Sequence, residues 1–399
     1  IIELDEQYLV QNYKKFDVAF TYGSGEFLYN TNGDQFYDFI SGIAVTNLGH
    51  AHPDLVDTIQ EQAKKLWHVS NLYEIPNQEE LANRLVDETF ADTVFFTNSG
   101  AESMECAIKM ARKYWFEKGE SNRSTIITFD NAFHGRTIAT ISAVGSEKLT
   151  KGFGPLLPGF VQIPIEKDDY SQLESEIQGS DVAAIIVEPI QGEGGIIPLS
   201  DEFLKVIRNL CDQTGVLLIF DEIQCGVGRT GKLFAHEWAG VYPDIMTIAK
   251  GIGNGFPLGA CLATEEAASG MTAGTHGSTY GGNPLACAVG LKVLDIISQP
   301  DFLADVNKKA GFFRQKLESL IAEHSEIFEL VRGQGFMLGI KCKVPNMDVV
   351  ANAYEHNLLL VPGGDNVIRL LPALNICEVE LTEAFHRLEL TALSLEAAL

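Results

Sequence analysis

Cysteine is scarce in this sequence of 399 residues. The seven copies, at positions 106, 211, 225, 261, 287, 342 and 377, are scattered and never spaced as Cys-x-x-Cys. This spacing argues against a zinc site or a disulfide framework, so we expect free thiols in a reducing, cytoplasmic compartment. The stretch from Ile1 to Glu6 has neither the basic nor the apolar region of a signal peptide, and no initiator methionine precedes it.

Positive charge and long apolar runs are also in short supply. Lysine and arginine number 29 against 54 aspartates and glutamates, which gives a net charge of −25. Such a surface argues against nucleic-acid backbones and anionic membranes as partners. The longest apolar runs, such as residues 182–187 and 216–220, are far too short to cross a bilayer.

The residues that are present describe a globular protein with more than one domain. Hydrophobic residues make up 46% of the chain and charged residues 21%, as in folded proteins. A chain of this length exceeds one ordinary hydrophobic core. We expect a large domain over residues 51–290, a small α+β domain over 291–399, and an N-terminal segment, 1–50, that packs with the small domain.

From about residue 90 onward, strands and helices alternate. Strands are predicted from apolar runs at 93–97, 125–129, 182–187, 216–220 and 245–249. Residues 102–118 have apolar positions at helical spacing. Strands separated by such crossovers predict an α/β fold with a mostly parallel sheet covered by helices on both faces.

Outside this region the sequence gives local signals. Asn32-Gly33 between two aromatic-rich runs predicts a hairpin, and Pro53 marks the first turn of a helix. Amphipathic segments at 303–324 and near 380–398 predict the helices of the smaller domain.

Ligands of an open α/β sheet bind beyond the carboxyl ends of the strands. The segments that follow the predicted strands are Asn98–Ala101, Asn131–Thr137, Glu188–Gly195, Asp221–Gln224 and Lys250. The sequence therefore predicts a helix N-terminus, an aromatic ring, an arginine, carboxylates and a lysine along one edge of the sheet.

Each of these groups has an ordinary role and a chemical one. Residues 99–101 (Ser-Gly-Ala) suit a phosphate or form a plain strand-to-helix turn. Asp221 needs a buried partner or caps a helix, and Phe133 stacks on a flat ring or joins the core. Lys250 is a desolvated nucleophile or a lysine that extends its amine to solvent. Together they meet the needs of pyridoxal phosphate (PLP), which a lysine holds as a Schiff base and an aspartate keeps protonated at the pyridine nitrogen.

Two other motifs suggest different ligands. Residues 226–231 match the dinucleotide fingerprint G-x-G-x-x-G, but they do not directly follow a strand and no clear helix comes after them. The acid at about the right distance, Asp244, precedes a strand. His50 and His52 lack the further ligands that would complete a metal site, so we expect no metal.

Three long motifs carry a resemblance to a known family. Residues 221–231, 243–251 and 276–286 resemble the class III aminotransferases of PLP fold type I, and the resemblance covers nearly the whole chain. It implies a large PLP-binding domain with a mostly parallel sheet and a smaller α+β domain. Within the class, residues 41–45, 67–73 and 78–82 most resemble the members that act on acetylornithine.

The resemblance implies how the cofactor is held. Lys250 would form the Schiff base and carry the proton between substrate and cofactor. Asp221 would pair with the ring nitrogen. The other implied cofactor-binding residues are Ser99, Gly100 and Ala101 at the phosphate, Phe133 and Ile223 around the ring, Gln224 near the 3′-oxygen, Glu222, and Thr279 from a partner subunit. Thr279 therefore implies a homodimer.

It also implies the substrates. Arg136 would bind the α-carboxylate, Ser278 would approach the substrate across the interface, and Glu193 and Arg369 would form a switchable ion pair. The implied reaction moves the δ-amino group of N2-acetyl-L-ornithine to 2-oxoglutarate, giving N-acetyl-L-glutamate 5-semialdehyde and L-glutamate, as in arginine biosynthesis. 4-Aminobutyrate and ornithine aminotransferases are the alternatives. The aliphatic Ile43 argues against free ornithine, whose enzymes carry an aromatic near this position. A protein that binds PLP without catalysis would lack one or more of these residues, and none of them is missing from this sequence.

Overall fold

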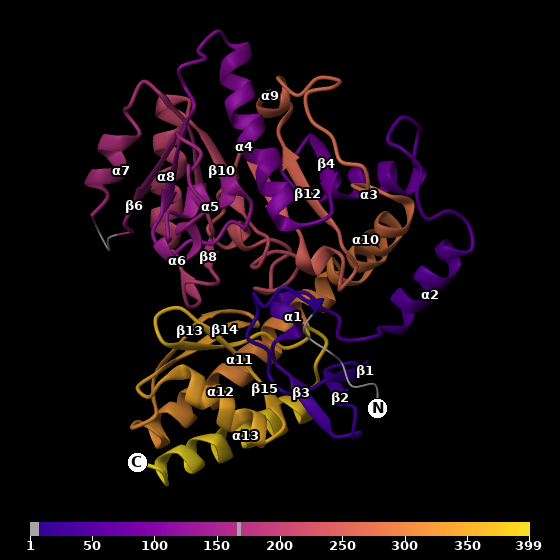
Figure 1. Ribbon diagram of the computed structural model, residues 1–399, viewed down its shortest axis with the longest axis vertical. Coiled ribbons are helices and arrows are strands. Elements are labelled where there is room, and N and C mark those ends of the chain that lie inside the picture. The colour runs from indigo at the N-terminus through magenta and orange to yellow at the C-terminus, as the bar shows by residue number, and fades with distance from the viewer. Residues whose placement is uncertain (1–7, 166–168) are drawn as a thin grey trace.

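The computed structural model describes residues 8–165 and 169–399, so the expectation about a signal peptide at residues 1–6 lies outside the described residues. A seven-stranded sheet forms the upper half of the molecule in Figure 1, and a smaller sheet with long helices forms the lower half. In the larger sheet the strand order is β4 (Thr93–Thr97), β12 (Gly259–Ala263), β11 (Ile245–Ile248), β10 (Leu217–Asp221), β7 (Val182–Val187), β5 (Thr125–Phe129) and β6 (Phe160–Ile163).

The prediction of a mostly parallel sheet is confirmed. Strands β11, β10, β7, β5 and β6 run parallel to one another. Strand β12 is antiparallel to both β11 and β4. Neither β12 nor β6 was predicted. The sequence of β12, Gly-Ala-Cys-Leu-Ala, is made mostly of small residues and follows a glycine-rich stretch, which hides the strand signal.

Alternation along a strand explains why helices cover both faces. In β10, Leu217 and Ile219 belong to the apolar cluster formed with α4 (Gly100–Glu117). Leu218 and Phe220 belong to the opposite cluster, formed with α8 (Asp201–Thr214). Because successive side chains of a strand point to opposite faces, a continuous apolar run requires cover on both sides.

The remaining elements of the upper half are shorter or lie beside the sheet. They are α2 (Pro53–Ala63), α3 (Pro76–Asp87), α5 (Ile138–Val144), α6 (Glu147–Thr150), α7 (Ser171–Glu176), the hairpin of β8 (Ile190–Gln191) and β9 (Ile197–Pro198), α9 (Glu265–Ala268) and α10 (Pro284–Ile297). Helix α2 begins at Pro53, as predicted, and α4 begins two residues before its predicted start. The described helices include none that is both long and apolar enough to span a membrane.

The lower half combines the two ends of the chain. Its four-stranded antiparallel sheet has the order β13 (Phe328–Gln334), β14 (Met337–Cys342), β17 (Val367–Leu370) and β16 (Val361–Gly363). The helices beside it are α11 (Pro300–Glu323), α12 (Asn346–Glu355) and α13 (Glu378–Glu396). The segment 303–324 and the last helix therefore lie where the sequence predicted helices.

The N-terminal segment is joined to this lower half. Strands β1 (Phe20–Ser24), β2 (Phe27–Asn30) and β3 (Gln35–Asp38) form antiparallel pairs, with the predicted hairpin turn between β2 and β3. Strand β3 then pairs in parallel with β15 (Leu358–Leu359). After the short helix α1 (Ser41–Ala44), the chain passes to the larger sheet. The domain boundaries at residues 50 and 290 remain predictions.

The turn that matched the dinucleotide motif connects these parts. Its Arg229 is fully buried and donates to the backbone oxygens of Phe336 (3.2 Å) and Pro372 (2.5 Å) and to Asn47 Oδ1 (2.6 Å). Gly228 and Gly231 have φ angles of 82° and 88°, which glycine adopts without strain. The motif therefore has a structural role that accounts for its glycines.

Candidate active site

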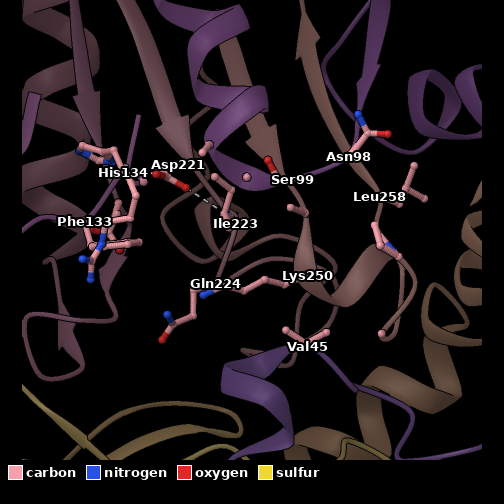
Figure 2. Close-up of a pocket in the computed structure, with 18 of the residues that line it drawn as sticks. Val45, Asn98, Ser99, Phe133, His134, Asp221, Ile223, Gln224, Lys250 and Leu258 are labelled. Carbon is pink, nitrogen blue, oxygen red and sulfur yellow. Dashed lines mark hydrogen bonds and ion pairs between the residues drawn. The ribbon is translucent and has the colours of Figure 1, made fainter. Parts of the chain in front are cut away.

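A cavity of about 390 Å³ lies at the carboxyl ends of the strands, where the sequence predicted it (Figure 2). Its walls come from segments that follow β4, β5, β7, β10 and β11, joined by Val45 from the N-terminal segment and by residues 255–258. The lining includes the predicted residues Ser99, Gly100, Ala101, Phe133, Arg136, Asp221, Ile223, Gln224 and Lys250.

Lys250 extends its amine into this cavity from the end of β11. Burial lowers the pKa of the amine below its usual value, and Arg369 lowers it further, while Glu193 opposes both. The backbone of Lys250 has φ = 49°, a left-handed conformation that is uncommon for a residue with a side chain. Strain of this kind persists where the surroundings over-determine it, and it directs this lysine into the cavity.

Asp221 lies at the floor of the cavity, where its carboxylate is fixed by two donors. Its Oδ2 accepts from His134 Nδ1 at 2.7 Å, and its Oδ1 accepts from the amide of Ile223 at 3.1 Å. Burial would lower the pKa of His134, but Asp221 and then Glu188 outweigh it, and the net pKa is raised. The second ring nitrogen of His134 is buried with no hydrogen-bond partner among the described residues.

Glu188 adds a second buried acid beside this pair. It accepts from the amides of Phe133 (2.8 Å) and Gly192 (3.2 Å). Burial, together with the charge of Asp221, raises its pKa to about 7. The segment that holds Phe133 is thereby tied to the end of β7.

The N-terminus of α4 forms the opposite wall. Ser99 caps the helix by accepting from the amide of Glu102 at 3.3 Å, and the amide of Ser103 donates to Ser99 O at 3.0 Å. The amides of Gly100 and Ala101 have no intrahelical acceptor, because they belong to the first turn. A Cβ at Gly100 would approach Ile223 Cγ2 to 2.8 Å, so only glycine allows this close packing. Free amides at a helix N-terminus suit an anion.

Phe133 and Ile223 both line the cavity (Figure 2). The guanidinium of Arg136 lies 5.2 Å from the centre of the Phe133 ring. Phe133 and Arg136 also line a second cavity of about 650 Å³, which Glu193 lines as well. The two cavities therefore adjoin at Phe133 and Arg136.

Glu193 and Arg369 form a bidentate ion pair next to Lys250. Arg369 Nη1 donates to Glu193 Oε1 at 2.6 Å, and Nη2 donates to Oε2 at 3.2 Å. Arg369 is 2% exposed and Glu193 is 35% exposed. Burial would raise the pKa of Glu193, but Arg369 outweighs it, and the net pKa is lowered. Arg369 therefore favours the charged form of the Glu193 carboxylate.

Besides Glu193 and Arg369, three predicted site residues do not line the cavity of Lys250. Glu222 is fully buried and accepts from the amides of Ala235 and His236, each at 2.8 Å, and from His236 Nδ1 at 2.9 Å. We therefore assign Glu222 to holding its loop and not to cofactor binding. Ser278 and Thr279 line a separate cavity of about 550 Å³ near Asn98. Their contribution to the site of a partner subunit remains a prediction.

Sequence reasoning missed His134, Glu188 and Val45, which line the cavity. His134 and Glu188 each stand in a segment that follows a predicted strand, so their position was a usable signal. Val45 had no such signal, because it reaches the site from the N-terminal segment.

The chain belongs to the class-III aminotransferases, since the family model described as "Aminotransferase class-III" matches residues 8–392. It is 59% identical to the acetylornithine aminotransferase of Rhodobacter capsulatus over 97% of this chain and 98% of that protein. Among solved structures, N-acetylornithine aminotransferase from Stenotrophomonas maltophilia has 38% identity and a TM-score of 0.85, with 99% of each chain covered. Ornithine aminotransferase from Toxoplasma gondii has 32% identity and a TM-score of 0.94, covering 99% of this chain and 94% of that one.

Enzymes of this class depend on PLP, and the cavity fits that group. The two free amides of α4 match a phosphate, and the space beside Phe133 and Ile223 matches a flat ring. The fixed carboxylate of Asp221 matches a protonated ring nitrogen, and the amine of Lys250 matches an aldehyde carbon. Each of these residues belongs to the described cavity, so the fit rests on this chain's own geometry.

Proposed function

We propose that the protein transfers the δ-amino group of N2-acetyl-L-ornithine to 2-oxoglutarate, as a step of arginine biosynthesis. The observation that carries this proposal is the closed Glu193–Arg369 pair beside Lys250. A free arginine there would attract any donor with a carboxylate next to its amine. An arginine that is paired with a glutamate leaves room for a donor whose reacting amine is on a CH₂ group without a neighbouring carboxylate. The acetylornithine aminotransferases of similar sequence support the choice among such donors.

When bound, PLP supplies the electron sink that stabilises negative charge on the carbon bearing the transferred nitrogen. Asp221 would pair with a protonated ring nitrogen, because its carboxylate is buried and is held by His134 and Ile223. The lowered pKa of Lys250 would leave its amine able to take the proton from Cδ of the donor and carry it toward the cofactor. Its enclosed position limits exchange of that proton with water.

Arg136 is the residue that holds the far carboxylate in both half-reactions. It lines the two adjoining cavities, and the bidentate geometry of a guanidinium matches a carboxylate. In the first half-reaction it would bind the α-carboxylate of acetylornithine. In the second, 2-oxoglutarate would displace Glu193 from Arg369 with the carboxylate next to its carbonyl, while Arg136 holds the other end.

Ornithine and 4-aminobutyrate present the same terminal amine and are the competing donors. Ile43 packs against the apolar cluster that contains Cys225 and Leu371. The family resemblance implies an aromatic residue near this position in the enzymes that act on free ornithine. Initial rates with the three donors at equal 2-oxoglutarate test the proposal. We expect the highest kcat/KM with N2-acetylornithine. A higher value with ornithine or 4-aminobutyrate would overturn the substrate assignment and keep the reaction class.

We also propose that the enzyme is a cytoplasmic homodimer in which Thr279 serves the partner's site. The cysteines are all free, as a reducing compartment requires. Ser278 and Thr279 lie near the N-terminus of α4 but outside their own chain's cavity. Mixing Lys250→Ala chains with Thr279→Ala chains tests this, because a mixed dimer contains one site with both native residues. Activity above that of either parent is expected, and a simple sum of the parents would contradict the shared site.

A further inference from the structure

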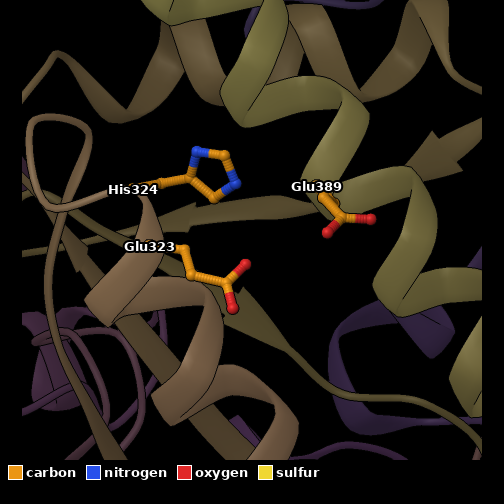
Figure 3. A group of neighbouring side chains, drawn as sticks. All are labelled: Glu323, His324 and Glu389. Atoms are coloured by element: carbon orange, nitrogen blue, oxygen red, sulfur yellow. The ribbon is translucent and has the colours of Figure 1, made fainter.

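The lower half of the molecule contains a histidine and two glutamates that lie close together (Figure 3). Glu323 is the last residue of α11, His324 follows it, and Glu389 belongs to α13. One ligand atom from each residue lies within 4.8 Å of the other two. These three side chains are called the α11–α13 cluster below.

His324 is held in a fixed orientation at the centre of this cluster. Its side chain is only 8% exposed, and its Nδ1 lies 3.0 Å from Glu396 Oε1. Nε2 is therefore the nitrogen left for a ligand, and no described residue forms a hydrogen bond with it. A carboxylate that fixes one ring nitrogen while the other faces outward is the usual surrounding of a metal-binding histidine.

The charges around the cluster favour a cation. Among the described residues, the ion pairs of Glu389 and Glu396 are made with His386 and His324, and Glu323 has none. No described lysine or arginine pairs with these three acids. Glu323 and His324 also stand at the C-terminal end of α11, where the helix dipole places partial negative charge.

We propose that Glu323, His324 and Glu389 bind one divalent cation of the Zn²⁺ type. One imidazole nitrogen and two carboxylate oxygens are ligands that Zn²⁺ accepts, with water in the fourth position. Mg²⁺ prefers an all-oxygen octahedron and is disfavoured by the imidazole. A bound ion links the end of α11 to α13 and so fastens the last helix of the chain to the smaller sheet.

Calorimetric titration of the EDTA-treated, dialysed holoenzyme with Zn²⁺ tests the proposal. We expect one Zn²⁺ per chain and a rise of a few degrees in Tm with Zn²⁺ in excess. Glu323→Gln and Glu389→Gln should each weaken the affinity by about tenfold or more, and Glu396→Gln by about 10- to 100-fold. Both ligand glutamates are at least partly exposed, so these variants should fold.

Glu318→Gln is the matched control, because it removes the same charge from an exposed position of α11 outside the cluster. It should bind Zn²⁺ as the unchanged protein does. The proposal is overturned if Zn²⁺ does not bind, or if Glu323→Gln and Glu389→Gln bind it with unchanged affinity. Equal affinity for Mg²⁺ and Zn²⁺ would also overturn it, because that result describes a plain acidic surface.

Discussion

Two carboxylates near Lys250 are held in opposite ways. Asp221 is 3% exposed, ends a buried strand and accepts from two donors of different segments. Glu193 is 35% exposed, lies between β8 and β9, and binds one arginine through its side chain. The difference shows which group can move. Asp221 has no exit, whereas Glu193 can turn to solvent and leave Arg369 to another carboxylate.

Further hydrogen bonds hold the main chain of Glu193 and the side chain of Arg369 in place, and leave the Glu193 side chain as the part that can move. Gly364 donates its amide to Glu193 O at 2.8 Å, which fixes the main chain of Glu193 and leaves only its side chain free to rotate. Arg369 also donates to Pro362 O at 3.0 Å and sits in β17, so the arginine stays in place when its partner leaves. A buried charge left unpaired is costly, and the opening therefore requires an incoming anion.

The largest effect is expected from removing Lys250, which lies near both carboxylates. Lys250→Ala should reduce kcat by at least about 10⁴-fold, since it removes the nucleophile and the proton carrier together. Borohydride reduction of the unchanged holoenzyme followed by peptide mapping should place the cofactor label on Lys250. Lys113→Ala, on the exposed side of α4, is the control and should keep full activity. A label on another lysine would refute the assignment.

The fixed carboxylate should matter in both half-reactions alike. Asp221→Asn removes a charge-assisted partner at a buried position, which costs about 1.5–3 kcal/mol, or roughly tenfold to more than a hundredfold in rate. Some cofactor should remain bound, because the α4 amides and the ring pocket are untouched. Single-turnover rates with each donor would measure the loss. Rates near those of the unchanged enzyme would show that Asp221 has no part in the chemistry.

The movable carboxylate of Glu193 should matter mainly in the acetylornithine half-reaction. Glu193→Ala unmasks Arg369, so the acetylornithine half-reaction should slow by about tenfold, the equivalent of 1.4 kcal/mol, while the glutamate half-reaction is spared or accelerated. The exposed pair of Arg332 with Asp365 (2.8 Å) supplies the control. Asp365→Ala should leave the ratio of the two donors unchanged. An equal fall in both half-reactions after Glu193→Ala would mean that the pair is merely structural.

The smallest effect is expected at Glu26, whose carboxyl group lies away from Lys250 and is shifted mainly by burial. Burial, and a hydrogen bond with Glu380, raise the pKa of Glu26 to about 7. A raised pKa means that the protonated form stabilises the fold, so this contribution is complete below about pH 4.5 and disappears as pH rises through about 7. Glu26→Gln should therefore flatten the decline of Tm between pH 6 and 8 by a degree or so. An unchanged pH profile would refute it.

The sequence predicted the parts of the site that follow one geometric rule. Asp221, Lys250 and residues 99–101 all follow apolar strands, and parallel strands bring their carboxyl ends to one edge. The partnership of His134 with Asp221 depends on the packing of the loop after β5 against β10, which no local pattern encodes. Glu193 and Arg369 were paired only through the family resemblance, because 176 positions separate them.

The same limit applied to the fold. The continuous apolar runs of β7 and β10 were visible because burial on both faces leaves no polar positions. The glycines of residues 226–231 match a nucleotide motif that their sequence context argues against, and the contacts of Arg229 with three separate segments are a structural role that no local pattern predicts. Likewise, the α11–α13 cluster includes Glu389, which belongs to a helix far from α11 in the sequence.

The hydrogen bonds between the N-terminal segment and residues 371–375 also determine when the molecule can finish folding. Phe39 O accepts from the amide of Leu371 at 2.8 Å, and Leu48 O accepts from Asn375 at 3.1 Å. Phe39 and Leu48 therefore cannot form these bonds until a much later part of the chain has been synthesised. At about 5–20 residues per second, the ribosome needs roughly 15 s to a minute to supply those partners. During synthesis Phe36 of β3 therefore lacks the ring of Tyr354, which stacks on it with 5.2 Å between ring centroids in the folded protein. Until then this aromatic surface is open to chaperones and to other unfinished copies.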